Sequence, residues 1–169
     1  SLSSDVKVRL PIIKSEGGSV EMGKVIYGLI QSSSAHITTY TDTYAGSISS
    51  LLLFAGHNRE ATMPSLIMVH RPYSSQGISD NAVRTYPEDH PVGSDVRNRG
   101  LKNLAWLKEQ YRLVSKTNIS EECVDALITK KDLSVLASVA TTLGWIDGIP
   151  SIDGKTLTVR YNDPRAIEY

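Results

Sequence analysis

Residues 44–56, YAGSISSLLLFAG, place three serines directly before a run of apolar side chains. The apolar run is typical of a buried helix, and Gly56 stands where a helix commonly ends. Serine is favoured at the first position of a helix, so one interpretation of Ser47 is a polar cap. The other is a nucleophile, because the helix dipole favours negative charge at that turn. Ser49 and Ser50 compete for the role, and Ser47 at the helix start is placed best.

The same order of strand, turn and helix recurs on both sides of this stretch. VKVRLPII (6–13) predicts a strand, and a helical pattern of apolar residues follows from a cap at Ser19. AHITTY (35–40) predicts a second strand, and the apolar run SLIMVH (65–70) is typical of a buried parallel strand. Repeated units of this kind favour an α/β protein with helices packed around a parallel sheet.

Three polar or glycine-rich turns follow these predicted strands. They are Gly17-Gly18, Ser47 and His70. Ligands of such folds bind at the carboxyl ends of the strands, so we expect the three turns to converge on one site.

The sequence after His70 changes character. Residues 71–100 are irregular and rich in Pro, Gly, Ser and charge, which predicts a projecting arm. An amphipathic helix is expected over 101–114, shorter helices over 120–128 and 133–144, a buried strand within 144–149, and a hairpin with an Asp-Gly turn over 151–161. We therefore expect one domain over residues 1–150 and a hairpin-like tail over 151–169.

The composition excludes several classes of partner. Eighteen basic and eighteen acidic side chains balance, so neither nucleic acid nor a membrane surface is an expected partner. No apolar run approaches the about 20 residues that cross a bilayer, so we expect a soluble protein. The single cysteine, Cys123, forms no internal disulfide and suits a reducing compartment. No metal and no cofactor are expected.

A serine is nucleophilic only beside a base and a group that stabilises an oxyanion. Of the four histidines, His70 ends an apolar run, where its imidazole needs hydrogen-bond partners. A serine and a carboxylate would satisfy it, and so would the backbone. Gly17-Gly18 offers unhindered N–H groups for an oxyanion, although such a pair is also common in turns. The residues alone leave the catalytic and the structural interpretation open.

Three segments taken together resemble the motif blocks of the ClpP serine peptidases, the proteolytic subunit of the Clp protease. They are IKSEGGSVEMGKVIYGLIQ (13–31), YAGSISSLLLFAGHNREATMPSLIMVHRP (44–72) and TKKDLSVLASVATTLGWIDGI (129–149). The resemblance covers residues 6–150 and implies a ClpP/crotonase-like fold. It also implies a serine endopeptidase that hydrolyses unfolded polypeptides inside an oligomeric ring of ClpP-like subunits, with an AAA+ ATPase unfoldase as a candidate partner. The implied location is the cytoplasm or an organelle stroma or matrix.

The resemblance also implies roles for individual residues. Ser47, nine residues before Gly56, takes the place of the nucleophile, and His70 that of the general base. Asp132, twelve residues before Gly144, takes the place of the aspartate that orients the imidazole. The backbone N–H groups of Gly18 and Ile48 are the implied oxyanion donors. The implied substrate-binding residues are Gly17, Gly18, Val20 and Pro72.

The sequence departs from the family pattern in four places. The sequence starts near the strand before the glycine pair, where the family normally has a preceding strand, a helix and N-terminal loops, so we expect those elements to be on another chain or absent; this puts the axial loops and the ATPase docking cleft in doubt. Glu16 stands where the family often has proline. The segment after His70 is longer than usual, within the arm that family members use to join two rings. The tail over 151–169 differs from the usual ending and has no assigned role.

Three other functions stay open at this point. The first is that of a non-catalytic structural subunit in a mixed ring. The second is that of a phage-type or capsid-maturation protease. The third is an acyl-CoA-handling crotonase, which shares the fold and the paired oxyanion donors but needs no Ser-His-Asp triad. The spacing of the three triad residues makes the third the weakest.

Overall fold

The computed structural model describes residues 6–76, 83–115, 121–129, 132–150 and 156–158. The strands are β1 (Lys7–Pro11), β2 (His36–Thr41), β3 (Tyr44–Gly46), β4 (Asn58–Ala61), β5 (Leu66–Val69), β6 (Ser74–Gln76), β7 (Val83–Thr85), β8 (Leu133–Leu136), β9 (Gly148–Pro150) and β10 (Thr156–Thr158). The helices are α1 (Val20–Gln31), α2 (Ile48–Phe54), α3 (Asp95–Val114), α4 (Glu121–Thr129) and α5 (Ala137–Thr142), with a 3₁₀ turn at Pro87–Asp89.

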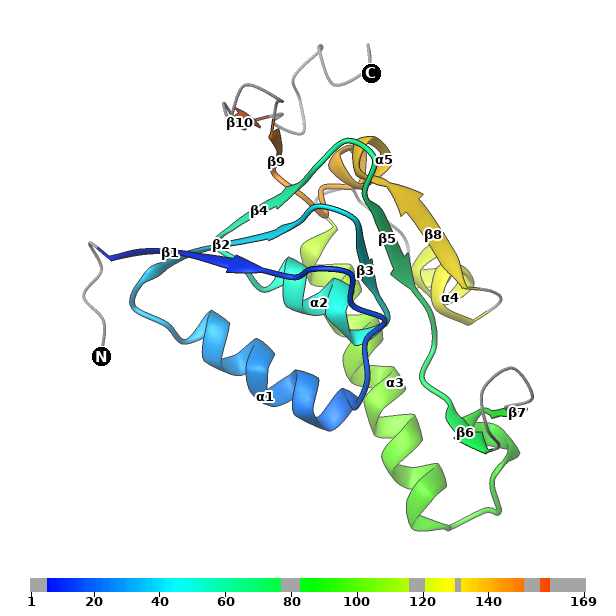
Figure 1. Ribbon diagram of the computed structural model, residues 1–169. Helices are drawn as coiled ribbons and strands as arrows, with labels where there is room; N and C mark the ends of the chain where they lie inside the picture. Colours follow the sequence, from blue (N-terminus) through cyan, green and yellow to red (C-terminus); the bar gives the residue numbers. More distant parts are fainter. Residues whose placement is uncertain (1–5, 77–82, 116–120, 130–131, 151–155, 159–169) are drawn as a thin grey trace.

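The strands form two main sheets that share their chain path. One sheet has the order β1-β2-β4-β9-β10, in which β10 alone runs antiparallel to its neighbour, and the other has the order β3-β5-β8. The chain passes from the first sheet to the second twice, from β2 into β3 and from β4 into β5 (Figure 1). After β1 the chain also reaches the second sheet, where Ser15 forms a parallel bridge to Ala45 of β3. The protein is therefore an α/β fold of repeated strand, turn and helix units, as the sequence predicts.

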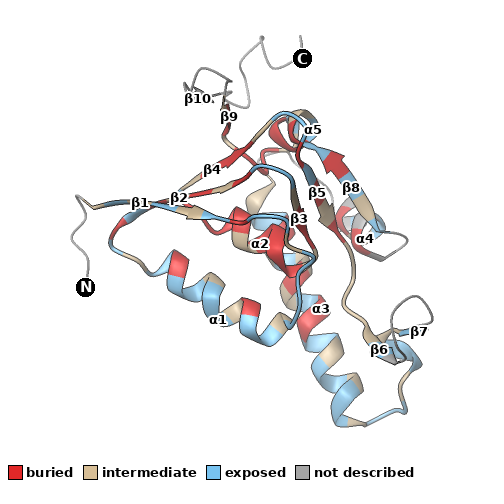
Figure 2. Cartoon of the chain, in the orientation of Figure 1, coloured by how far each residue is buried: buried red, intermediate tan, exposed pale blue. Residues whose placement is uncertain are grey.

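The core lies between the sheets and the central helix α2, which is buried along most of its length (Figure 2). α1 packs on α2 from one side, and the long helix α3 passes from the arm back to α2 (Figure 1). The largest side chains that are fully buried include Leu51, Leu53, Ile67 and Trp145. Burying such side chains is the main favourable term in folding, and here it fixes the turn that precedes α2.

The main repeats were predicted correctly from the sequence. The strands expected in 6–13, 35–40 and 65–70 are β1, β2 and β5, and the helix after Ser19 is α1. The Ser19 hydroxyl accepts the backbone N–H of Met22 at 3.3 Å, as a capping serine does. No helix within the described part of the chain is long and apolar enough to cross a bilayer.

Three predicted elements were wrong in kind or extent. The first four residues of the helix expected over 133–144 form β8, because Val135 and its neighbours pair with β5. The arm over 71–100 contains the hairpin β6–β7. The helix expected over 101–114 is longer, because α3 starts at Asp95, where Ser94 caps it. The last residues of the predicted arm therefore belong to α3.

The turn before Ser47 and the end of the chain differ in smaller ways. Residues 44–46, expected as a turn, form strand β3, and β4 was not predicted. The strand expected within 144–149 begins only at Gly148, and it pairs with β10 as a hairpin would. The Asp-Gly turn of that hairpin and the side chain of Cys123 lie outside the described residues.

Candidate active site

The expected strand ends converge on one cavity. β3 runs parallel to β5, and the segment at Ser15 forms a parallel bridge to Ala45 of β3. The three segments therefore end at the same edge of the sheet. A cavity of about 420 Å³ lies at this edge. Its lining residues are Glu16, Gly17, Gly18, Val20, Ser47, Met68, His70, Pro72, Tyr73 and Arg84.

Ser47 forms the sharp turn between β3 and α2. Its backbone has φ 56° and ψ −132°, a conformation that side-chain-bearing residues rarely adopt. Such strain persists only where the surroundings enforce it, and it clusters at functional sites. The Ser47 N–H donates to the Met68 carbonyl at 2.9 Å, and the Ser50 hydroxyl donates to the Ser47 carbonyl at 2.6 Å. The side chain of Ser47 makes no capping bond to α2, so its hydroxyl is not engaged as a cap.

The three serines of this turn differ in their surroundings. Ser49 and Ser50 are buried, whereas Ser47 is half-buried and borders the cavity. The Ser49 hydroxyl lies 2.5 Å from that of Ser15, and the Ser50 hydroxyl lies 3.1 Å from that of Tyr111. Ser49 and Ser50 thus hold the turn in place, and Ser47 faces the space where a substrate would bind.

The glycine pair passes directly over Ser47. Gly17 has φ 97° and Gly18 has φ 150°, both in the region that favours glycine. A Cβ on Gly17 would lie 2.6 Å from the Cβ of Ser47, which no side chain tolerates. The same atom on Gly18 would meet nothing within 4 Å. The backbone at Gly18 is therefore open to an incoming group.

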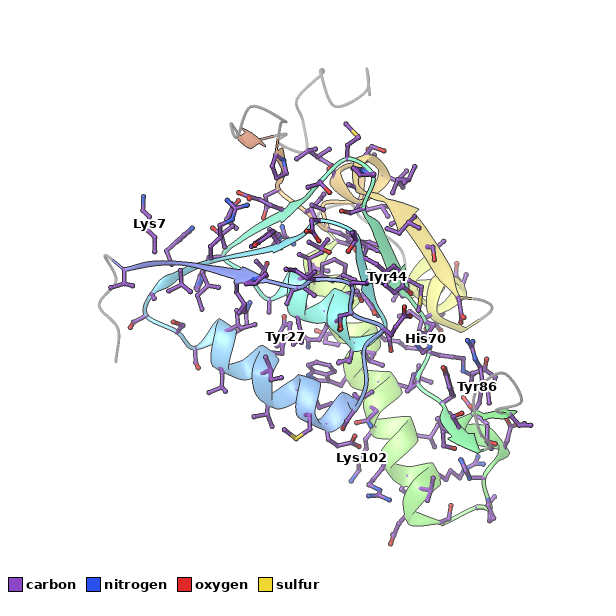
Figure 3. The ribbon with its side chains drawn as sticks, viewed as in Figure 1. Lys7, Tyr27, Tyr44, His70, Tyr86 and Lys102 are labelled. Carbon is purple, nitrogen blue, oxygen red and sulfur yellow. The ribbon has the colours of Figure 1, made fainter. Side chains whose placement is uncertain are left out.

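His70 follows β5 and lies where the chain passes into the arm (Figure 3). Its Nδ1 lies 2.6 Å from the Arg71 carbonyl oxygen. A carbonyl only accepts, so Nδ1 carries the proton and Nε2 is left as the basic nitrogen. Burial lowers the pKa of His70 below its ordinary 6.5; the Arg71 carbonyl and the Asp132 charge oppose the shift, and the Arg84 charge adds to it. The imidazole is consequently neutral at pH 7, as a general base must be.

Asp132 lies beside His70 through the register of two strands. β5 and β8 are antiparallel with Val69 opposite Leu133, so His70, which follows Val69, comes near Asp132, which precedes Leu133. The Asp132 carboxylate nevertheless binds Arg84, whose Nη1 lies 2.9 Å from Oδ1 and 2.8 Å from Oδ2. Among the described residues no hydrogen bond joins Ser47, His70 and Asp132 to one another.

The other residues with implied roles lie around the same edge. Ile48 is the first residue of α2 and is buried, which leaves its backbone N–H at the start of the helix. Val20 and Pro72 both line the cavity; Val20 follows the glycine pair closely, and Pro72 lies at the start of the arm. No group of three His, Cys, Asp or Glu side chains in the described segments is arranged to hold a metal ion.

The sequence did not reveal the arm residues that surround His70. Tyr73 lies 5.2 Å from the His70 ring, and the Arg84 guanidinium lies 4.6 Å above the Tyr73 ring. No motif marks either residue, because both belong to the arm that was predicted as irregular. A hairpin pattern around the described strands β6 and β7 is the only signal that would have placed Arg84 near Tyr73.

The fold and this edge define the class of protein: an α/β protein of the ClpP type with a serine at a strained strand-to-helix turn. The model of the Clp protease family matches residues 2–89. The chain belongs to the Clp protease family.

Its relatives include proteolytic subunits from chlamydiae. The chain is 30% identical over 141 residues to ATP-dependent Clp protease proteolytic subunit 1 of Chlamydia muridarum (strain MoPn / Nigg). This alignment covers 82% of this chain and 67% of that protein. The protein of the same name from Chlamydia pneumoniae is also 30% identical, over 82% of this chain and 68% of its own length. The corresponding protein of Chlamydia trachomatis serovar D is 30% identical, and the alignment covers 82% of this chain and 67% of that protein.

Proposed function

We propose that this protein is a serine endopeptidase that cleaves unfolded polypeptides through an acyl-enzyme. The observation that carries the proposal is the strained Ser47 at the edge of a cavity that it shares with His70. Backbone strain at a polar residue has no structural purpose that a glycine would not serve better, and it aims the hydroxyl into the cavity. Membership of the Clp protease family supports the same reaction.

The proposed mechanism uses Ser47, His70 and Asp132 in their implied roles. His70 Nε2 takes the proton of the Ser47 hydroxyl while the oxygen attacks the peptide carbonyl. The resulting imidazolium gives its proton to the leaving amine, and water then hydrolyses the ester by the same base. Asp132 stabilises the imidazolium when its carboxylate accepts a hydrogen bond from Nδ1–H.

The proposed oxyanion donors are the backbone N–H groups of Gly18 and Ile48. Gly18 is open to the cavity, and Ile48 begins a helix whose dipole favours negative charge. The extended substrate would lie beside Gly17 and Gly18, with Val20 and Pro72 flanking the bond that is cut. A glycine loop at the edge of a cavity suits a polypeptide that binds in an extended form.

We further propose that the chain works in an oligomeric ring, with an AAA+ ATPase unfoldase as a candidate partner, in the cytoplasm or an organelle stroma or matrix. The curated relatives are named as subunits of an ATP-dependent protease, which supports an assembly. Exposed apolar side chains on α1 support it as well, because a monomer rarely leaves such a run in water. They are Met22, Val25, Ile26 and Leu29.

Labelling with a fluorophosphonate tests the enzyme proposal. The assembled wild type is expected to react, and Ser47→Ala is expected to abolish the reaction. Ser134→Ala is the matched control, since Ser134 is exposed on β8 and takes no part in the Ser47 turn. An assembled wild type that takes up no label contradicts the proposal.

A second candidate is a non-catalytic subunit of a mixed ring. The engagement of Asp132 by Arg84 favours it, because this carboxylate does not reach His70. The mass of the purified assembly separates the two candidates. A homo-oligomer that labels at Ser47 supports the enzyme, whereas obligate co-purification with a second, catalytic chain supports the structural subunit.

A further inference from the structure

The arm provides the hydrogen-bond partners of both His70 and Asp132. Arg71, at the start of the arm, accepts the Nδ1 proton of His70 through its carbonyl at 2.6 Å. Arg84, on strand β7, binds both carboxylate oxygens of Asp132 through Nη1 at 2.9 and 2.8 Å. A triad requires a hydrogen bond from His70 Nδ1 to the Asp132 carboxylate. Here Nδ1 binds the Arg71 carbonyl instead, and the carboxylate binds Arg84 instead.

Arg84 is held in this place by its own surroundings. It lies opposite Ser75 in the β6–β7 hairpin, and its guanidinium stacks over the ring of Tyr73 at 4.6 Å. Tyr73 in turn lies 5.2 Å from the ring of His70, and both Tyr73 and Arg84 line the Ser47 cavity. The position of the arm therefore determines where Arg84 meets Asp132.

The backbone already brings Asp132 to the correct neighbourhood. Because Leu133 pairs with Val69, Asp132 follows in register beside His70 on the adjacent strand. For the carboxylate to meet Nδ1, Asp132 must leave Arg84 and the His70 ring must leave the Arg71 carbonyl. The ion pair that opposes this change is weak, since the Arg84 and Asp132 side chains are 43% and 38% exposed.

We propose that Arg84 is a positioning residue that withholds Asp132 from His70, so that loss of this ion pair allows the carboxylate to meet His70 Nδ1. The inference rests on the proposed roles of Ser47, His70 and Asp132. Arg84 acts through Asp132 and does not itself touch the reacting atoms.

A titration of His70 by NMR tests the inference without requiring activity. The charged and titratable groups around His70 are Glu16, Tyr44, Arg71, Tyr73, Arg84 and Asp132. Four proteins are compared: the wild type, Arg84→Gln, Asp132→Asn and the double variant. Arg84→Gln frees the carboxylate, so it is expected to raise the His70 midpoint by about one pH unit. Adding Asp132→Asn is expected to remove most of that rise.

The four-way comparison separates positioning from plain charge. Removing the Arg84 charge alone also raises the midpoint, but that contribution does not depend on Asp132. A rise of the same size with and without Asp132→Asn overturns the inference, and so does no rise at all. Arg71→Gln is the matched control, because Arg71 is also an arm arginine, stacked on Tyr86 and paired with Glu88. It is expected to show no change that depends on Asp132.

The rate of fluorophosphonate labelling gives the second measurement. Arg84→Gln is expected to label Ser47 about tenfold faster than the wild type, and Asp132→Asn to cancel the gain. Arg84→Lys keeps a cation for Asp132 and is expected to stay near the wild-type rate. Slower labelling of a folded Arg84→Gln variant overturns the inference. If no variant labels, the proposed function fails, and the NMR comparison still decides whether Arg84 positions Asp132.

Discussion

Gly17 lies directly against Ser47, so closely that a Cβ on Gly17 would come within 2.6 Å of the Ser47 Cβ and 3.1 Å of its Oγ. The two residues come from different repeats, and the parallel bridge between Ser15 and Ala45 aligns them. The glycine loop and the strained serine therefore form one unit, in which neither can move without the other.

Replacing Gly17 by alanine is expected to abolish labelling of Ser47. Alanine at φ 97° costs about 1–2 kcal/mol of stability, and the clash with Ser47 must displace the turn as well. Gly28→Ala is the matched control. Gly28 lies inside α1 with nothing within 4 Å of its added Cβ, so this change is expected to stabilise the fold by about 0.5–1 kcal/mol. Thermal unfolding and labelling measure both, and full labelling of Gly17→Ala would show that the loop is not part of the site.

Ser50 supports the Ser47 turn from below, which gives a second prediction. Its hydroxyl donates to the Ser47 carbonyl and contacts the buried Tyr111 hydroxyl, whose pKa is raised by burial. Ser50→Ala leaves both oxygens without this partner and is expected to cost about 1–3 kcal/mol. Labelling of Ser47 is expected to slow in the folded variant. Chemical denaturation measures the loss, and Ser134→Ala, on the exposed side of β8, provides the reference.

The convergence of Ser47 and His70 was predictable because it follows from the strand repeat. Parallel strands end at one edge, so recognising the strand repeat brought the turns together, although β3, the strand that leads into Ser47, was itself not predicted. The positive φ of Ser47 was not predicted from the sequence.

Neither the position of Asp132 beside His70 nor its ion pair with Arg84 could be derived from local sequence patterns, for two different reasons. Its place beside His70 depends on β8 being a strand, and residues 133–144 have the apolar spacing of a helix as well. Pairing with Ile67 and Met68 decides between the two, which no local pattern reveals. Its partner Arg84 is 48 residues away in sequence, so only the folded hairpin brings the two together.

The lowered pKa of His70 gives a pH prediction for both activity and stability. Labelling needs the neutral imidazole, so its rate is expected to fall with acid at a midpoint below 6.5. Stability follows the same group: the folded protein binds this proton more weakly than the unfolded chain does. His70 therefore lowers stability as the pH drops below about 6.5, until the folded protein also takes up the proton. A labelling midpoint at or above 6.5 would contradict the buried, neutral imidazole.

The ion pair between Arg59 and Asp147 gives the last prediction. The Arg59 side chain is 8% exposed, and its Nε and Nη2 donate to the two Asp147 oxygens, each at 2.7 Å. The pair ties β4 to the segment before β9, and Asp147 also accepts the backbone N–H of Arg59 at 3.0 Å. Asp147→Ala leaves a buried guanidinium without its carboxylate, so a loss of about 3–5 kcal/mol is expected.

Denaturant unfolding measures this loss, and the surface pair of Glu109 and Arg112 provides its control. Both of those side chains are about half exposed, at 49% and 51%, and water replaces the lost contact. Glu109→Ala is therefore expected to leave the unfolding midpoint unchanged. Equal effects of Asp147→Ala and Glu109→Ala would mean that burial adds nothing to the Arg59 pair. A large effect confined to Asp147 would show that the sheet that contains β4 and β9 depends on this buried charge being paired.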